Sequence, residues 1–236
     1  EKKATVSRPV KEDAVDTGLK KILSIPREQK GLLCLACTNK KDKSIAYFTG
    51  EEWNSLSIDV QSQYAKTGVS IYDDGHTFII APEDCKAEDG HDEFQFGGSR
   101  MAYVGVKNYK SKPVEFMTGY NDTKAIVEQC KGKKDKYGIL GVPAAEAAWN
   151  FKANEYDNLQ WYLPSISEVY LIYRYKDKIS VFLNMYFFEK DEIANKEYWS
   201  STVSCYGAWY VCMYNGNGYI CSRHSSGRVR AVSVAE

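Results

Sequence analysis

The stretch from Tyr198 to Val234, here called the recognition stretch, holds the side chains best suited to binding chemistry. Between Ser200 and Ala235 the sequence has no Lys, Asp, Glu or Gln, although charged residues make up 26% of the chain. Tyr, Ser, Cys, Gly and Asn fill it instead, together with one His and three Arg. Ordinary exposed faces are rich in Lys and Glu, whereas recognition loops use Tyr for stiff contact area and Ser, Gly and Asn for adaptable hydrogen bonds. The composition therefore predicts noncovalent ligand binding.

Two other groups of residues could hold a metal ion or do redox chemistry. Cys34 and Cys37 form a C-x-x-C pair within the apolar run GLLCLACT. The pair fits a redox or zinc site, but no second pair completes a zinc site and the run also fits a buried strand, which is our interpretation. The acidic run 84–93 surrounds His91. It fits a cation site or a solvated loop, and we interpret it as the loop.

Motifs of other reaction classes are missing from the sequence. It contains no Gly-rich phosphate loop, no G-x-S-x-G elbow and no H-E-x-x-H pair. Lys plus Arg and Asp plus Glu number 31 each, so no bulk charge attracts nucleic acid or a membrane surface. No apolar run reaches the length of a membrane span. We therefore expect no metal, no cofactor, no nucleic-acid partner, no membrane span and no enzymatic activity.

The first half of the chain has the pattern of β-strands. The runs GLLCLACT, SIAYFT, TGVSIYDD and HTFIIAP are short and apolar or alternating, and Asp73-Asp74-Gly75 predicts a hairpin between the last two. The run FQFGGSRMAYVGVKNY predicts a further pair of strands. Thr49 and Glu52 form a capping box, which predicts that a short helix begins there.

Three more helices are predicted between the β-rich first half and the recognition stretch. Asn121-Asp122-Thr123 is expected to cap a helix that Gly132 closes. Pro143 suits the first turn of the next helix, and Ser165 with Glu168 forms a capping box for the third.

Short strands are predicted throughout the recognition stretch. They are YWSST, AWYVCMY, GYICS and RVRAVSV, with a turn at Asn215-Gly216. Strand alternation places Trp209, Val211 and Met213 on the inner side of the second strand. It places Tyr210, Cys212 and Tyr214 on the outer side.

Several blocks of the sequence together resemble a known family. WSST at 199–202, Ala208-Trp209, Asn215-Gly216 and VRAV at 229–232 resemble the C-terminal repeat of variable proteins that retroelements diversify in bacteria and phages. The blocks TGEEW, GVSI and FIIAPED resemble the N-terminal half of such proteins from gut-bacterial phages and prophages. The pattern W-x-LPS-x-x-E at 161–168, followed by YWSST, resembles the bacterial branch of the C-type lectin fold that includes formylglycine-generating enzymes.

The resemblance implies a fold class and a domain organisation. It implies an α+β, C-type-lectin-like fold with a β-rich N-terminal portion. We expect residues 1–30 to be an arm or connector, 31–118 the β-rich portion and 119–236 the lectin-like portion, with a variable region at 200–232.

The resemblance also divides the recognition stretch into changeable and constant positions. In that family, Asn codons ending in a pyrimidine are randomised at their adenines, which never yields Lys, Glu, Gln, Met or Trp. A catalytic role for His224 is not expected, because the next variant would lose it. The predicted ligand-binding residues are Ser204, Tyr206, Tyr210, Cys212, Tyr214, Asn215, Asn217, Tyr219, Cys221, Ser222, Arg223, His224 and Ser226. The predicted scaffold residues are Trp161, Trp199, Trp209, Gly216, Arg228 and Arg230, although the two arginines fit ligand contact equally well.

The function that follows from this comparison is nonenzymatic attachment. The expected partner is a protein or glycan on a cell surface, and the arm at 1–30 would join a phage tail or an envelope assembly. No signal peptide is visible, and the expected location is a virion or a bacterial cell surface. Two alternatives stay open: a carbohydrate-binding or enzymatic domain of the same fold with fixed specificity, and a structural lectin-like module.

Overall fold

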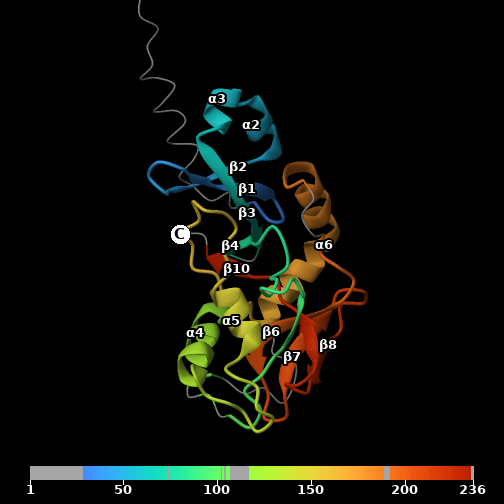
Figure 1. The fold of residues 1–236 in the computed structure, drawn as a ribbon. Helices are drawn as coiled ribbons and strands as arrows, with labels where there is room; N and C mark the ends of the chain where they lie inside the picture. Colours follow the sequence, from blue (N-terminus) through green and yellow to red (C-terminus); the bar gives the residue numbers. More distant parts are fainter. Residues whose placement is uncertain are drawn as a thin grey trace, which may run out of the picture.

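The computed structural model describes residues 29–73, 75–101, 103, 105–106, 117–188 and 192–234. The predicted arm at 1–30 therefore lies, except for its last two residues, outside the described residues. The fold is mixed α+β, as the sequence predicted, with two mostly antiparallel sheets and few helices (Figure 1).

The first sheet, called sheet A, is built from the predicted apolar runs. Its strand order is β10-β4-β3-β1-β2, and all neighbouring strands are antiparallel. Its strands are β1 (Leu33–Asn39), β2 (Ile45–Phe48), β3 (Tyr64–Asp73), β4 (His76–Ile80) and β10 (Val232–Val234). The predicted hairpin joins β3 to β4, with Asp73 paired to His76. Cys34 and Cys37 are buried on opposite faces of β1, which confirms the strand interpretation.

The second sheet, called sheet B, carries the recognition stretch. Its strand order is β5-β9-β6-β7-β8, and only β6 and β9 run parallel. Its strands are β5 (Glu93–Gln95), β6 (Glu197–Val203), β7 (Ala208–Cys212), β8 (Gly218–Cys221) and β9 (Ser226–Arg228). The predicted turn between β7 and β8 is present, and Gly216 adopts φ of 73° there. A positive φ of this kind favours glycine.

The helices begin largely where local signals placed them. They are α2 (Gly50–Ser55), α3 (Ile58–Gln61), α4 (Gly119–Cys130), α5 (Pro143–Trp149) and α6 (Ile166–Tyr186). Both predicted capping boxes are formed, at Thr49 for α2 and at Ser165 for α6. The predicted cap of α4 at 121–123 is wrong, because the residue at the cap position is Thr118, three residues before Asn121. This helix begins at Gly119, and Asp122 is inside it, where its carboxylate accepts a hydrogen bond from Thr118.

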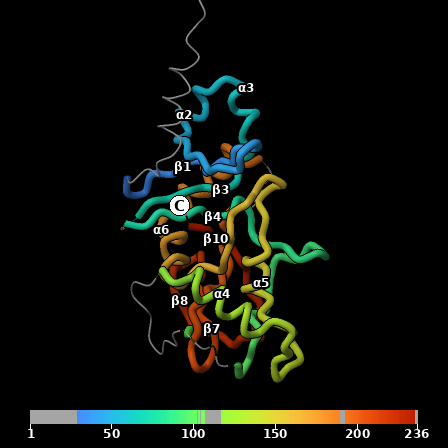
Figure 2. The backbone as a smooth tube through the Cα atoms, turned by 90° about the vertical axis from the view of Figure 1, so that its left-hand side faces the viewer, coloured from blue at the N-terminus to red at the C-terminus, as the bar shows by residue number. Residues whose placement is uncertain are grey.

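Helix α6 covers one face of both sheets, and helices α4 and α5 lie on the other face of sheet B (Figures 1 and 2). Helix α6 packs on β3 of sheet A and on β6 and β7 of sheet B. One core cluster lies on this side, where Ile172 and Leu183 of α6 meet Val69 of sheet A and Val211 of sheet B. Helices α4 and α5 contribute to a second cluster, which contains Trp161 and Trp199. A single long helix therefore packs against both sheets.

One strand prediction is wrong, and another lies partly outside the described residues. The run that begins at Phe94 was expected to form two strands; its first part belongs to β5 and then turns at Gly97 and Gly98, which both have positive φ, and most of the second expected strand lies outside the described residues. The run RVRAVSV was expected to be one strand. It is divided between β9 in sheet B and β10 in sheet A, because Arg230 points into the protein between them and is fully buried.

A buried carboxylate anchors this crossing from one sheet to the other. Asp84, in the loop after β4, pairs with Arg230 (Nε to Oδ1, 2.7 Å) and with Arg228 (Nη1 to Oδ2, 3.0 Å), and it accepts a hydrogen bond from the Tyr198 hydroxyl (2.8 Å). Burial alone would lower the pKa of Arg230, but the carboxylate outweighs this effect and the pKa is raised. Arg230 therefore stays charged at every physiological pH.

Replacing Asp84 should destabilise the whole domain. Asp84→Asn leaves two guanidinium groups next to a neutral amide, and removing one partner of a buried pair costs about 3–5 kcal/mol. Urea denaturation measures this loss in the free energy of unfolding. The control is Asp89→Asn, because Asp89 belongs to the same acidic run but is exposed, and it should change the stability by less than about 0.5 kcal/mol. A loss below about 1 kcal/mol for Asp84→Asn would contradict the anchoring role.

Candidate ligand-binding surface

The structure separates the thirteen predicted ligand-binding residues into three groups. The exposed residues, here called the candidate binding face, are Tyr206, Tyr214, Asn215, Asn217, Tyr219, Ser222 and Ser226. The half-buried residues are Tyr210, Cys221 and His224, and the buried ones are Ser204, Cys212 and Arg223. Three tyrosines of the candidate binding face leave much of their surface in solvent: 82% for Tyr206, 57% for Tyr214 and 44% for Tyr219.

Most of the candidate binding face follows the β7–β8 hairpin, whereas Ser226 lies in β9 on the other side of β6. Tyr206 lies in the short turn between β6 and β7, and Tyr214 lies in the turn between β7 and β8. Tyr210 and Tyr219 are paired across the hairpin, with ring centroids 5.9 Å apart. At about 3.4 Å per residue, the five residues of β7 separate the two turns by roughly 17 Å. The tyrosines therefore form a row along the hairpin.

Tyr210 is the fixed centre of this row. Its ring packs edge-on against Trp199, with centroids 5.7 Å apart, on the sheet face that α6 does not cover. Burial, together with the nearby thiols of Cys221 and Cys212, raises the pKa of Tyr210 to about 12. Its hydroxyl therefore stays protonated and can donate a hydrogen bond to a ligand.

The outward positions predicted for Ser204 and Cys212 are wrong. Ser204 begins the turn to β7, exchanges backbone hydrogen bonds with Gly207 and has no exposed surface. Cys212 was assigned outward by strand alternation, but the residue is buried. Burial is the main reason why the pKa of Cys212 is raised, although the nearby Tyr214 hydroxyl opposes it. Alternation gives only the side of the sheet on which a residue lies, and its exposure depends on what covers that side.

Arg223 was predicted to contact ligand, and this prediction is also wrong. Its side chain is 8% exposed and donates to four backbone carbonyls: Gly98 (2.8 Å), Met101 (3.0 Å), Ser204 (3.3 Å) and Gly207 (3.3 Å). The guanidinium also lies 4.8 Å from the centre of the Tyr103 ring. Arg223 therefore ties the turn that carries Tyr206 to the loop at 97–103.

Four of the six predicted scaffold residues lie in the interior. Trp161, Trp199, Trp209 and Arg230 are buried, whereas Gly216 and Arg228 are half-buried. Arg228 forms ion pairs with Asp84 and Asp92, so both arginines brace the sheet. Sequence reasoning missed Asp84, because it lies in the acidic run that was interpreted as solvated. The sequence did contain one signal for it. Arg228 and Arg230 are two residues apart in an otherwise apolar run, and arginines that are buried there need a carboxylate partner.

The two sequence blocks that carry the resemblance touch each other. The Ser201 N–H donates to the carbonyl of Pro164 (2.8 Å), and the Ile166 N–H donates to the Thr202 hydroxyl (3.0 Å). LPS at 163–165 and WSST at 199–202 thus join the start of α6 to β6.

Other candidate chemistry is not assembled in the described residues. All seven cysteines are free thiols. Across the described ranges, no three His, Cys, Asp or Glu side chains are placed to share a metal ion. Within the same part of the chain, no helix has the length and apolarity that a bilayer crossing requires. His91 lies in an exposed loop next to Asp89.

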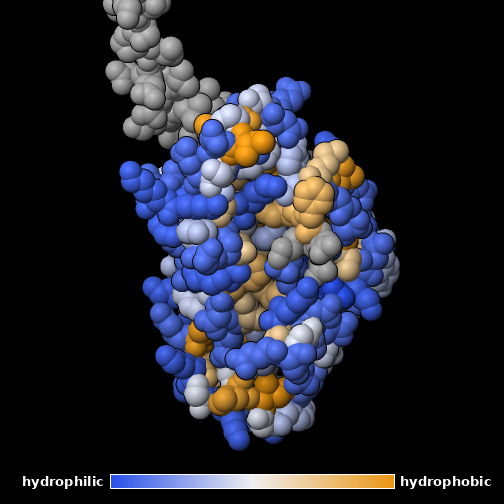
Figure 3. Space-filling view, turned by 45° about the horizontal axis from the view of Figure 1, so that its top comes forward, coloured by the Kyte–Doolittle hydropathy of each residue, from blue (hydrophilic) through white to orange (hydrophobic). Residues whose placement is uncertain are grey.

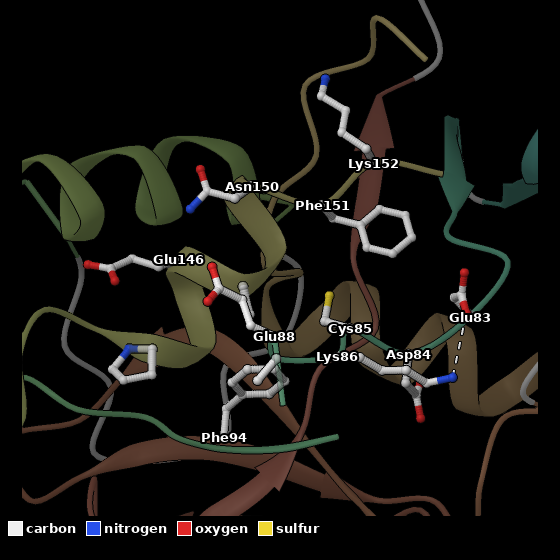
Figure 4. Close-up of a pocket in the computed structure, with 13 residues that line it drawn as sticks. Glu83, Asp84, Cys85, Lys86, Glu88, Phe94, Glu146, Asn150, Phe151 and Lys152 are labelled. Carbon is white, nitrogen blue, oxygen red and sulfur yellow. Dashed lines mark ion pairs between the residues drawn. The ribbon is translucent and has the colours of Figure 1, made fainter. Parts of the chain in front are cut away.

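A fixed cavity of about 540 Å³ opens between α5, β5 and the loop at 83–88 (Figure 4). Phe94 and Phe151 line it together with the carboxyl-bearing side chains of Glu88 and Glu146. A second cavity, of about 580 Å³, lies beside β2 and β10. No residue of the 200–232 region lines either cavity, so the candidate binding face is separate from both.

Comparison with known proteins gives no relative of this chain: no protein-family model matches it, and no curated protein does.

Removing the Arg223 side chain should destabilise the turn at 204–207. Arg223→Met removes four hydrogen bonds that the buried guanidinium donates, which should lower the free energy of unfolding by about 3 kcal/mol. Chemical denaturation measures it, and the exposed Arg100→Met is the matched control. Equal stability of the two variants would show that Arg223 is not the tie between these loops.

Proposed function

We propose that this chain is a nonenzymatic binding protein that displays a diversifiable, Tyr-rich surface for attachment to a target on a cell surface. The observation that carries the proposal is the separation of side chains within one short stretch. The residues of the WSST and VRAV blocks are buried and brace the sheet, whereas eight residues between these blocks are exposed, Cys205 and the seven of the candidate binding face. Substitution of an exposed side chain that takes no part in packing or bracing usually changes the stability little. The candidate binding face can therefore vary while the fold persists.

The chemistry of the exposed side chains supports recognition. Tyr206, Tyr214 and Tyr219 offer large aromatic area with few rotatable bonds, and Asn217 and Ser222 offer hydrogen bonds. Aromatic side chains of this type supply much of the binding energy in protein interfaces.

We further propose that the fold is C-type-lectin-like and that a retroelement diversifies the 200–232 region. The contacts between LPS and WSST support the first part, because these blocks carry the resemblance. The second part applies to some positions only. At Gly207 a Cβ atom would lie 2.0 Å from the carbonyl oxygen of Cys221, so this position must stay glycine. The positions free to vary are Tyr206, Tyr214, Asn217, Tyr219, Ser222 and Ser226. The proposed location is a phage virion or a bacterial cell surface.

The fixed cavity supports a second candidate function, which is binding of a carbohydrate with constant specificity. Its two phenylalanine rings could stack on a sugar, and Glu88, Glu146 and Asn150 could accept hydrogen bonds from hydroxyl groups. Because this cavity is separate from the candidate binding face, substitutions in one should not affect binding at the other.

The exposed tyrosines should contribute little to folding. The double variant Tyr214→Ser and Tyr219→Ser should change the free energy of unfolding by less than about 1 kcal/mol, because the two residues are 57% and 44% exposed. Thermal and urea denaturation provide the measurement. The control is Tyr198→Ser, which removes a buried ring and its bond to Asp84 and should cost at least about 3 kcal/mol. A comparable loss in the double variant would show that these two tyrosines stabilise the fold and would contradict the proposal.

The DNA around the coding sequence provides the test of diversification. We expect a near-identical copy of the segment for residues 200–232, differing from it at adenines, next to a gene for a reverse transcriptase. Sequencing the locus checks this expectation. A locus that lacks both the copy and the reverse transcriptase gene would contradict diversification. The proposal would then be reduced to a binding protein of constant specificity.

A further inference from the structure

A second, constant surface element lies beside the candidate binding face. Residues 131–141, here called the basic hairpin, turn back on themselves through backbone hydrogen bonds from Gly138 to Asp135 (3.0 Å), Asp135 to Ile139 (2.9 Å) and Gly141 to Lys133 (2.8 Å). It follows α4 and precedes α5 (Figure 1).

Asp135 makes the basic hairpin rigid. Its carboxylate is buried and accepts hydrogen bonds from the backbone N–H groups of Tyr137 (2.8 Å), Ile139 (3.0 Å) and Ser99 (3.0 Å). Ser99 lies in the same loop whose carbonyls hold Arg223. The basic hairpin and the turn that carries Tyr206 are therefore fixed to one loop, and their relative positions are set.

The basic hairpin exposes two large hydrophobic side chains. Tyr137 and Leu140 each leave 56% of their surface in solvent, although most of the surface in Figure 3 is hydrophilic. The Tyr137 ring packs edge-on against His224 of the recognition stretch. Tyr137 therefore joins a constant part of the chain to the recognition stretch at His224.

Four exposed lysines belong to the same hairpin, at 131, 133, 134 and 136, and the ammonium group of Lys136 lies 4.1 Å from the centre of the Tyr137 ring. Residues 200–235 contain no acidic side chain. The combined surface is therefore aromatic and apolar in one part and positively charged in the adjoining part. It is complementary to a protein with an apolar patch bordered by carboxylates.

We propose that the basic hairpin is a constant half of the binding site, in which Tyr137 and Leu140 contact an acidic protein partner while the candidate binding face supplies the changeable contacts. This inference rests on the proposed function. The constant half would contribute a similar part of the binding free energy in every variant, whichever acidic protein is bound. The lysines would accelerate association with acidic targets.

The test uses binders selected from a display library of the full chain. The six free positions are randomised with the Asn-derived codon set, and the library is selected separately against serum albumin and ovalbumin, two acidic proteins. Tyr137→Ser with Leu140→Ser is then introduced into each binder. We expect at least a tenfold weaker affinity for both targets with unchanged melting, and a slower association when Lys133→Glu and Lys136→Glu are introduced.

The matched control is Val181→Ser with Met185→Ser on α6, where the two side chains are 55% and 61% exposed. This control should leave the affinity within twofold. Binders whose affinity survives the Tyr137 and Leu140 substitutions within twofold would overturn the inference and leave the proposed function intact. A library that folds but yields no binder to either target would overturn the proposed function and this inference with it.

Discussion

The buried carboxylate of Asp84 is the constraint on which the rest of the structure depends. It lies where the closing segment leaves sheet B, and Arg228, Arg230 and Tyr198 all converge on it. A buried charge is costly unless it is paired and hydrogen-bonded. The two arginines are two residues apart, so their side chains point to the same side of the extended segment. Their pairing with one carboxylate fixes where the chain crosses from sheet B to sheet A.

This crossing explains how the two sheets come to act as one frame. Strand β10 comes from the end of the chain but pairs with β4, and β5 comes from the first half but pairs with β9. Each sheet thus holds a strand from the other half of the chain, and α6 packs against both. The recognition stretch is consequently supported by contacts outside itself. Its exposed side chains are left with little part in holding the fold.

The position of the candidate binding face also limits its function. The face is a row of side chains along a hairpin, whereas small molecules are usually held in concave sites. The two fixed cavities lie elsewhere. A row of tyrosines beside a rigid, positively charged hairpin is better suited to the broad surface of a protein. The loop at 97–103 links the changeable and constant parts, because it accepts hydrogen bonds from Arg223 and donates one to Asp135.

The sequence by itself determined the features that depend on near neighbours in the chain. The capping boxes at Thr49 and Ser165, the turn at Gly216 and the buried strand around Cys34 all follow from local chemistry, and the structure has them. Composition alone indicated the stretch that we propose for recognition. Tertiary structure decided which side chains of that stretch reach solvent. Arg223 is enclosed by a loop more than a hundred residues away, and Asp84 is buried because two distant arginines neutralise it. Burial depends on what covers a residue in space, and residues far apart in the chain supply that cover.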